Sequence, residues 1–376
     1  MEPKSRKRRS QAEQTEERKN EHIRVCLEED VKAKNVTTGF EDVFLIHKAL
    51  PEIDLRKIDT ATSFLNHKFS APIIIESMTG GTEKALKINA AVAQAVEELG
   101  IGMGVGSQRA ALENPDLART YAIVRKKAPN AFIMANIGAP QLKKGYGFKE
   151  AKRAIDMVEA DALLIHLNPL QEAIQPEGET DYAGILEKIR ELTSVLTVPV
   201  IVKETGAGIA AEEAKKIKEA GAAAIDVAGA GGTSWAAVEY YRAKQQGDLL
   251  GQETGKVLWD WGISTVVSLI EVVRSAGLPV IASGGVRSGA DAAKAIALGA
   301  DLVGFAGPVL DPALKGSEAV KMKIESTVHL LRTVMFLVGA DSIEKLKASP
   351  IVITGRTAEW LRARGFDLEI YAKRGG

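Results

Sequence analysis

Short apolar runs alternate with amphipathic stretches along most of this chain. From residue 72 onward, runs rich in Val, Ile and Ala are each followed by Gly, Ser, Thr, Asn or Pro and then by a helix-forming stretch, such as 83–99, 212–220 or 290–298. This alternation is typical of parallel strands joined by outer helices. The predicted strands are 72–76, 100–105, 132–137, 162–167, 200–204, 223–228, 280–283 and 302–306.

These repeated units predict an α/β fold, a (β/α)8 TIM barrel. The length of 376 residues fits one barrel of roughly 250 residues with terminal additions. A doubly wound open sheet is the rival fold, but its Gly-rich turn should follow the first strand alone, whereas here such turns recur after several strands. We therefore expect a single barrel domain over 23–376, with 23–71 as an N-terminal cap and 310–376 completing the last helix and adding a short helical tail.

Charge and composition limit the partners and the compartment. Lysine plus arginine and aspartate plus glutamate each number 49, which gives no global reason to bind nucleic acid or an acidic membrane. No apolar stretch approaches the ~20 residues of a membrane span, and the single cysteine, Cys26, fits a reducing cytoplasm. The polar start, 1–21, lacks an apolar signal core. Its basic run at 4–9 favours a solvated terminus over a nucleic-acid-binding arm.

Polar residues cluster where the predicted strands end. In a parallel barrel these ends open toward one rim, where barrel enzymes carry their active sites. After strands seven and eight, Ser283–Gly289 and Gly304–Pro308 are Gly-rich, as in the phosphate sites of barrels. Arg287 adds a positive charge, and Ser288 with Asp291 can cap the following helix. Each Gly-rich turn alone is compatible with simple turn geometry.

Two further features of the rim point to chemistry. Lys203 ends strand five, where a lysine in a barrel mouth is costly unless it meets an anion or a cofactor ring; a surface lysine is the alternative. Alternation places His166 and Asn168 on one strand face, and the turn after them brings Gln171 and Glu172 back over the mouth. A lone carboxylate there suits Mg²⁺, which takes its other ligands from water and phosphate. A structural role for His166 with an exposed Glu172 stays open, and no His/Cys spacing indicates zinc.

The motifs together resemble one family, the type 2 isopentenyl-diphosphate delta-isomerases, which are FMN-dependent barrel enzymes. The resemblance covers nearly the whole chain. Its motifs are Arg18-Lys-Asn-Glu-His22, Ser77-Met-Thr-Gly-Gly81, Gly106-Ser-Gln-Arg109, His166-Leu-Asn-Pro-Leu-Gln-Glu172, Lys203-Glu-Thr-Gly206, Asp226-Val-Ala-Gly-Ala-Gly-Gly-Thr233, Ser283-Gly-Gly-Val-Arg287 and Ile353-Thr-Gly355 through Trp360-Leu361. Single motifs are weak signals, but their order is specific. Glu76 and Ala228 lie at positions that look variable in the family.

The resemblance implies a role for each matching residue. FMN would be bound by Ser77, Met78, Thr79, Ser107, Asn136, Lys203, Thr233, Gly285, Arg287, Ala306 and Gly307. The substrate would be bound by Arg18, Lys19, His22, Ser107, Gln108, Arg109, Asn168 and Gln171. Gln171, His166 and Lys203 would be the catalytic residues, and Glu172 would hold Mg²⁺.

The implied reaction interconverts isopentenyl and dimethylallyl diphosphate by a 1,3-allylic proton shift. In the family the reduced FMN ring is taken to do the acid–base work, and NAD(P)H serves only to reduce it. We expect residues 1–22 to form a flexible charged arm that closes over the substrate as a lid. The resemblance also implies a homo-oligomer, a tetramer or octamer.

Three other functions remain as alternatives. An FMN barrel oxidoreductase, such as a 2-hydroxy-acid oxidase, shares the late phosphate loops but would oxidise its substrate. A nucleotide dehydrogenase would need a loop cysteine, and Cys26 lies upstream of the barrel strands. A non-enzymatic barrel would have lost the polar residues of the mouth, which are present.

Overall fold

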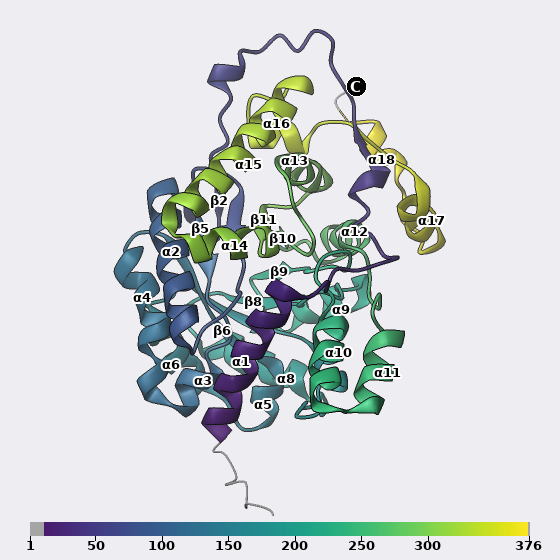
Figure 1. Ribbon diagram of the computed structural model, residues 1–376. Coiled ribbons are helices and arrows are strands. Elements are labelled where there is room, and N and C mark those ends of the chain that lie inside the picture. Colours follow the sequence, from purple (N-terminus) through teal and green to yellow (C-terminus); the bar gives the residue numbers. More distant parts are fainter. Residues whose placement is uncertain (1–10, 375–376) are drawn as a thin grey trace, which may run out of the picture.

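The core of the molecule is a closed parallel barrel, which confirms the predicted fold (Figure 1). The computed structural model describes residues 11–374, with side chains from residue 17 on; the predicted basic run at 4–9 lies outside this range. In spatial order the barrel strands are β10-β11-β4-β5-β6-β7-β8-β9. Their bounds are β4 Ile73–Ile75, β5 Gly102–Gly104, β6 Phe132–Gly138, β7 Ala162–His166, β8 Val200–Lys203, β9 Ala224–Asp226, β10 Val280–Ala282 and β11 Leu302–Phe305.

Helices surround the barrel, and those that pack on the strands turn an apolar side toward them. The helices between successive strands are α2 Glu83–Leu99, α3 Arg109–Glu113, α4 Arg119–Lys127, α5 Ala139–Lys143, α6 Phe148–Val158, α7 Pro169–Ile174, α8 Ile185–Val195, α9 Ala211–Glu219, α10 Trp235–Gln246, α11 Leu249–Val257, α12 Thr265–Ala276 and α13 Gly289–Leu298. In α2, Ile88, Val92 and Val96 are buried at helical spacing. The Thr82 side chain accepts a hydrogen bond from Ala85 N–H at its start.

Aromatic side chains close the N-terminal end of the barrel. The predicted cap contains a hairpin of β2 Thr62–Phe64 and β3 His67–Phe69. Phe64 and Phe69 are buried, and their rings lie 6.1 and 5.6 Å from that of Phe132, the first residue of β6. The hairpin therefore covers the start of the barrel strands with its aromatic side chains, as expected of a cap.

The C-terminal region contains more than the predicted helical tail. Its helices are α14 Gly307–Lys315, α15 Ser317–Leu337, α16 Ile343–Lys347, α17 Gly355–Ala363 and α18 Glu369–Ala372. A short strand, β12 Ile351–Ile353, also pairs antiparallel with β1 Val43–Leu45. The sequence analysis missed both strands because each has three residues and a partner about 300 positions away in the chain, so no local repeat marks them.

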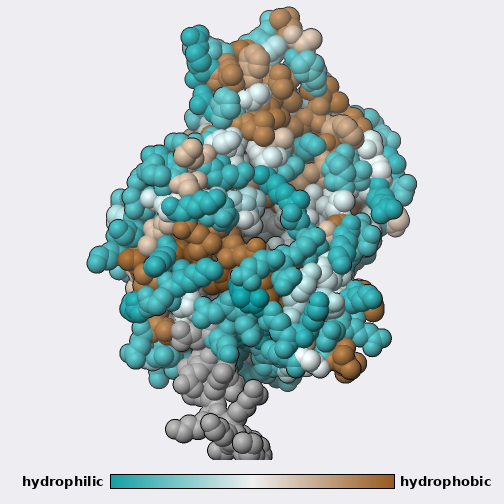
Figure 2. All heavy atoms as spheres, in the orientation of Figure 1, coloured by the Kyte–Doolittle hydropathy of each residue, from teal (hydrophilic) through white to brown (hydrophobic). Residues whose placement is uncertain are grey.

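The face shown in Figure 2 is largely hydrophilic, with several apolar areas. One such area lies at the top of that view, over the cap segment and the C-terminal helices. In these parts of the chain, Leu50 of the cap segment is 75% exposed and Leu337, at the end of α15, is 40% exposed. Among residues 11–374, no helix is both long and apolar enough to cross a membrane.

Removing one ring of the aromatic closure should destabilise the barrel. We expect Phe69→Ala to lower the free energy of unfolding by about 3–5 kcal/mol, because it leaves a cavity beside Phe132. Phe44→Ala, at a side chain that is 51% exposed on β1, is the matched control and should change stability little. Urea denaturation of both variants makes the comparison. Equal losses in the two would show that the hairpin does not close the barrel.

Candidate functional site

Strand register brings three charged or titratable side chains to one edge of the barrel. His166 ends β7 and pairs with Lys203 at the end of β8, and Lys203 pairs with Asp226 at the end of β9. Paired residues of parallel strands project to the same side of the sheet. The structure therefore brings the two predicted residues His166 and Lys203 together at the C-terminal mouth, with Asp226 as an unpredicted third member.

Lys203 is held at the mouth by partners from other strands. Its Nζ lies 2.7 Å from Asp226 Oδ2 and 2.9 Å from Glu76 Oε2, and it donates a hydrogen bond of 3.2 Å to Ser283 Oγ. Burial disfavours the ammonium, but Asp226 and Glu76 together raise the pKa of Lys203 above its ordinary value. Burial and the nearby Asp226 raise the pKa of Glu76. Lys203 is therefore a fixed positive charge in the floor of the mouth.

His166 is oriented by a neighbouring strand. Its Nδ1 lies 2.7 Å from Oδ1 of Asn136 on β6, and since an amide oxygen only accepts, Nδ1 carries the proton. Burial, with the positive charges of Lys203 and Lys19, lowers the pKa of His166 to about 4. The imidazole is therefore neutral at pH 7. Its Nε2 accepts hydrogen bonds until it is protonated, which a nearby anion would favour.

Gln171 and Glu172 return over the mouth on helix α7, as the turn at Pro169 predicts. Asn168 precedes this helix, and its Nδ2 donates to Gln171 Oε1 at 3.2 Å and to Glu172 Oε1 at 2.9 Å. Glu172 Oε2 accepts from Gln175 Nε2 and from the backbone N–H of Glu179, both at 2.7 Å. All three predicted residues are buried, so the alternative of an exposed Glu172 is wrong.

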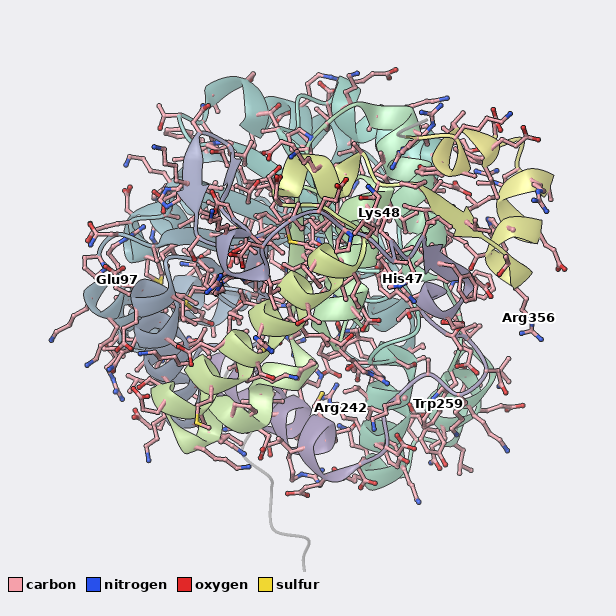
Figure 3. The ribbon with its side chains drawn as sticks, turned by 90° about the horizontal axis from the view of Figure 1, so that it is seen from above. His47, Lys48, Glu97, Arg242, Trp259 and Arg356 are labelled. Carbon is pink, nitrogen blue, oxygen red and sulfur yellow. The ribbon has the colours of Figure 1, made fainter. Side chains whose placement is uncertain are left out.

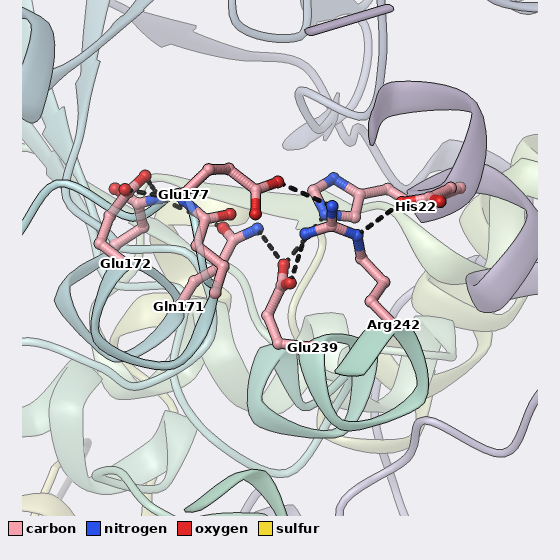
Figure 4. Close-up of polar contacts among 9 residues, drawn as sticks. His22, Gln171, Glu172, Glu177, Glu239 and Arg242 are labelled. Atoms are coloured by element: carbon pink, nitrogen blue, oxygen red, sulfur yellow. Dashed lines mark hydrogen bonds and ion pairs between the residues drawn. The ribbon is translucent and has the colours of Figure 1, made fainter. Parts of the chain in front are cut away.

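The sequence analysis missed a charged pair on helix α10 that contacts Gln171 (Figure 4). Gln171 Nε2 donates to Glu239 Oε1 at 2.9 Å, and Arg242 Nη1 donates to Glu239 Oε2 at 2.6 Å. Burial disfavours the charged carboxylate, yet hydrogen bonds from His22 and Gln171 and the charge of Arg242 hold the pKa of Glu239 at about 2. The i, i+3 spacing of Glu239 and Arg242 was the available signal, but it does not identify partners outside the helix.

The N-terminal helix α1, Gln11–Glu28, lies across the mouth. Lys19 Nζ donates to Ser107 O, after β5, at 2.7 Å, while His22 Nε2 lies 3.0 Å from Glu239 Oε1 on α10, after β9. In the barrel, β5 and β9 are separated by β6, β7 and β8 on one side and by β10, β11 and β4 on the other. From above, Arg242 lies beside α1 (Figure 3). Predicted arm residues thus reach both sides of the mouth.

Lys19 enters a small polar pocket. Besides Ser107 O, its Nζ contacts the hydroxyl of Tyr121, whose own O–H donates to Ser107 O at 2.7 Å. Burial and the positive charges of Arg18 and Arg109 lower the pKa of Lys19 to about 7. Tyr121 was not predicted from the sequence, because it lies within α4 rather than after a strand. It gives the predicted substrate residue Lys19 a fixed position at the mouth.

The late Gly-rich loops form a backbone cradle. Ser288 and Asp291 cap α13 reciprocally, as predicted, and Asp291 Oδ2 also accepts from Arg287 N–H at 3.1 Å. The backbone N–H groups of Arg287 and Ser288 are therefore already paired with Asp291. Among the described residues, the N–H groups of Gly285 and Gly307 have no acceptor. A side chain at Gly307 would meet no atom within 4 Å, whereas one at Gly285 would meet Thr38 and Gly232, so the open space lies beside Gly307.

Other predicted residues line this mouth or its walls. Ser77 Oγ is buried and has no partner among the described residues. Thr79 is buried, Met78 packs against the core, and Ala306 is the N-cap of α14, next to Gly307. Arg287 and Thr233 are exposed. Arg109 Nε donates to Glu113 Oε1 at 2.8 Å.

Gln108 does not reach the mouth with its side chain. It is fully buried, with Nε2 donating to Ala154 O and Oε1 accepting from Asn136 N–H, both at 2.8 Å. The predicted substrate contact is therefore not seen. Instead, Gln108 holds the backbone of β6 at Asn136. The prediction failed because residues at a strand end alternate between the mouth and the wall, and the sequence alone did not settle which of the two Gln108 faces.

A small cleft opens beside Gln171. It is lined by the loop after β8, including Glu204, and by Thr233, Trp235 and Trp259. Burial raises the pKa of Glu204 to about 7, although the backbone N–H groups of 205–207 donate to its Oε2. Within the described part of the chain no group of three or more His, Cys, Asp or Glu residues is placed to hold a metal.

Comparisons with known proteins show the family of this chain. The FMN-dependent dehydrogenase family matches residues 150–353. The isopentenyl-diphosphate delta-isomerase of Methanosarcina barkeri is 50% identical over 361 residues, covering 96% of this chain and 98% of that protein. That of Pyrococcus furiosus is 52% identical over 365 residues, covering 95% and 91%.

Solved structures show the same fold in more distant proteins. A flavocytochrome b2 variant with sulfite bound has a TM-score of 0.65 at 20% identity, covering 92% of this chain and 85% of that one. A mandelate oxidase variant with benzaldehyde has a TM-score of 0.60 at 20% identity, covering 91% and 97%. At such identities the likeness concerns the fold alone.

The neutral state of His166 leads to a test by NMR. We expect inorganic diphosphate to raise the pKa of His166 from about 4 toward its ordinary 6.5, since a nearby anion favours the imidazolium. Imidazole ¹⁵N shifts can follow this, because the chain has only 5 histidines. His67, in the hairpin at the other end of the barrel, is the control. Diphosphate binding that leaves the titration of His166 unchanged would contradict its place in the anion site.

The lowered pKa of His166 also makes the free energy of unfolding depend on pH. Because the folded protein favours neutral His166, the stabilisation from this group is present above pH 6.5 and is lost as pH falls toward 4.

Proposed function

Because this chain belongs to the isopentenyl-diphosphate delta-isomerases and is an isomerase, we propose that it interconverts isopentenyl and dimethylallyl diphosphate by a 1,3-allylic proton shift. The observation that carries this proposal is the meeting of His166, Lys203 and Gln171 at one mouth, next to a cradle of unpaired backbone donors. Reduced FMN bound there would supply the acid–base chemistry.

The residues present fit FMN. Phosphate suits the free N–H groups of Gly285 and Gly307, to which the exposed Arg287 adds charge. Ser77 Oγ is a buried hydroxyl without a partner that a cofactor atom would satisfy. The other proposed FMN residues are Met78, Thr79, Ser107, Asn136, Lys203, Thr233 and Ala306. Lys203 would offer its fixed positive charge to an anionic ring.

The diphosphate would be bound by cations around α1 and α3. We propose Arg18, Lys19, His22 and Arg109 for this role, with Ser107, His166 and Asn168 beside them. Lys19 already lies over Ser107. Opposite charge would favour the ammonium form of Lys19, whose pKa burial has lowered to about 7.

Glu172 fits a Mg²⁺ ion that keeps water and phosphate ligands. Its carboxylate accepts one hydrogen bond at Oε1 and two at Oε2, so Oε1 retains a lone pair for a metal. Glu172 would thus link the cation to the diphosphate. NAD(P)H would be needed only to reduce FMN.

Gln171 would hold the alkene or relay a proton beside the cofactor. Its amide orientation is set on both sides, with the oxygen toward Asn168 and the nitrogen toward Glu239.

Three wider properties complete the proposal. Residues 1–22 would act as a lid, of which the structure describes 11–22 as part of α1. The exposed apolar area with Leu50 and Leu337 would contribute to a homo-oligomer, a tetramer or octamer. The single cysteine fits a cytoplasmic location.

The backbone cradle can be tested without measuring turnover. We expect Gly307→Asp to weaken FMN binding by roughly 30-fold or more, because it places a carboxylate where phosphate would meet free N–H groups. The open space at Gly307 should keep the fold intact. Gly147→Asp, also in open space at a helix start, is the control. Flavin fluorescence titration measures affinity, and unchanged affinity in Gly307→Asp would remove the phosphate site from these loops.

The reaction itself can be tested with pre-reduced FMN under anaerobic conditions. We expect isopentenyl diphosphate to be converted without net nicotinamide consumption. Gln171→Leu should lower kcat by roughly 100-fold, the lower range for a residue in acid–base catalysis. Gln94→Leu, on the outer helix α2, is the control. Nicotinamide consumed in proportion to product would instead indicate an oxidoreductase.

A further inference from the structure

Arg242 is a buried cation shared by three segments of the chain. Its side chain is 3% exposed. Nε donates to Glu21 Oε2 on α1 at 2.9 Å, Nη1 donates to Glu239 Oε2 on α10 at 2.6 Å, and Nη2 donates to Glu177 Oε1, after α7, at 2.7 Å. The planar guanidinium presents its donors in a fixed fork, which a lysine cannot reproduce. One side chain therefore fixes the relative positions of α1, α10 and the segment after α7.

The partners of Arg242 differ in exposure. The Glu239 side chain is fully buried, whereas those of Glu21 and Glu177 are 27% and 40% exposed. Arg242 thus connects two peripheral segments with a carboxylate in the interior. One of those segments is the helix that crosses the mouth, and the other supplies Glu179 N–H to Glu172.

Glu239 carries the connection onward to Gln171. A single oxygen, Oε1, accepts from Gln171 Nε2 at 2.9 Å and lies 3.0 Å from His22 Nε2 on α1 (Figure 4). Because a carboxylate only accepts, His22 Nε2 must be the donor. The same carboxylate therefore orients the Gln171 amide and receives a donor from α1, and Arg242 holds it in place from the other side.

We propose that Arg242 is a positioning residue that couples docking of α1 over the mouth to the orientation of Gln171. When α1 leaves the mouth, Arg242 loses Glu21 and Glu239 loses His22. Glu239 then has fewer bonds that fix it, and the Gln171 amide is less well oriented. The role assigned to Gln171 rests on the proposed function, whereas the coupling between α1 and Gln171 rests on the contacts alone.

The test uses the full chain loaded with FMN and three variants. Arg242→Lys keeps the charge but loses the fork. Glu21→Gln is the milder change, at a partly exposed partner, and avoids a buried substitution that could prevent folding. Glu28→Gln is the control, because among the residues that the structure describes Glu28 pairs with Arg24 alone, on the exposed side of the same helix.

We expect both Arg242→Lys and Glu21→Gln to accelerate hydrogen exchange of the backbone over 17–28 by about tenfold, in line with the loss of a charged hydrogen bond. With reduced FMN and isopentenyl diphosphate, kcat should fall by a similar factor, while FMN affinity stays unchanged. Glu28→Gln should alter neither quantity. Unchanged exchange in Arg242→Lys, or unchanged kcat in a Glu21→Gln protein with faster exchange, would overturn the coupling.

A reciprocal measurement separates coupling from a merely structural role. Coupling between two parts of a molecule acts in both directions. We therefore expect Gln171→Leu, which removes one donor from Glu239, also to accelerate exchange over 17–28. No change there would overturn the proposal. If the wild-type protein failed to isomerise the substrate, the proposed function would fall, while these exchange measurements would still decide the coupling.

Discussion

The mouth of this barrel depends on one buried ammonium group. Lys203 loses its hydration at the end of β8, and such a charge is tolerated only when it is paired. Asp226 ends the neighbouring strand β9, and Ser283 follows β10, the next strand along. Glu76 follows β4, which does not pair with β8, so Glu76 meets Lys203 only when the sheet closes on itself. Closure of the barrel therefore also brings the charges of the site together.

A second layer of charge lies above this floor. Glu239 and Arg242 on α10 face the opposite side of Gln171 from Asn168, and α1 adds Glu21 and His22 to them. The floor is supplied by strand ends, whereas this layer is supplied by helices and by the N-terminal segment. The proposed substrate residues thus come from both layers, with His166 and Asn168 at the base and Lys19 and His22 on α1.

The strands were predictable because each apolar run is buried on both faces, and the run from 132 to 137 differs from β6 by one residue. The same regularity put His166, Lys203 and Gln171 at the mouth. Contacts that depend on tertiary geometry were not predictable. Nothing in the local sequence distinguishes Arg242 from other helix arginines, because its partners Glu21 and Glu177 come from distant parts of the chain. Gln108 was assigned to the mouth because a strand-end position does not reveal which way its side chain turns.

The aromatic hairpin under the barrel has a consequence for proton traffic. Phe64, Phe69 and Phe132 close the end opposite the mouth, and the strand interiors above them are lined by buried aliphatic side chains. In the described part of the chain, these aliphatic side chains offer no hydroxyl or amide groups for a relay toward the solvent below. We therefore expect isotope from heavy water to reach Lys203 and its carboxylates from the side that α1 covers, so the rate of exchange reports on that helix.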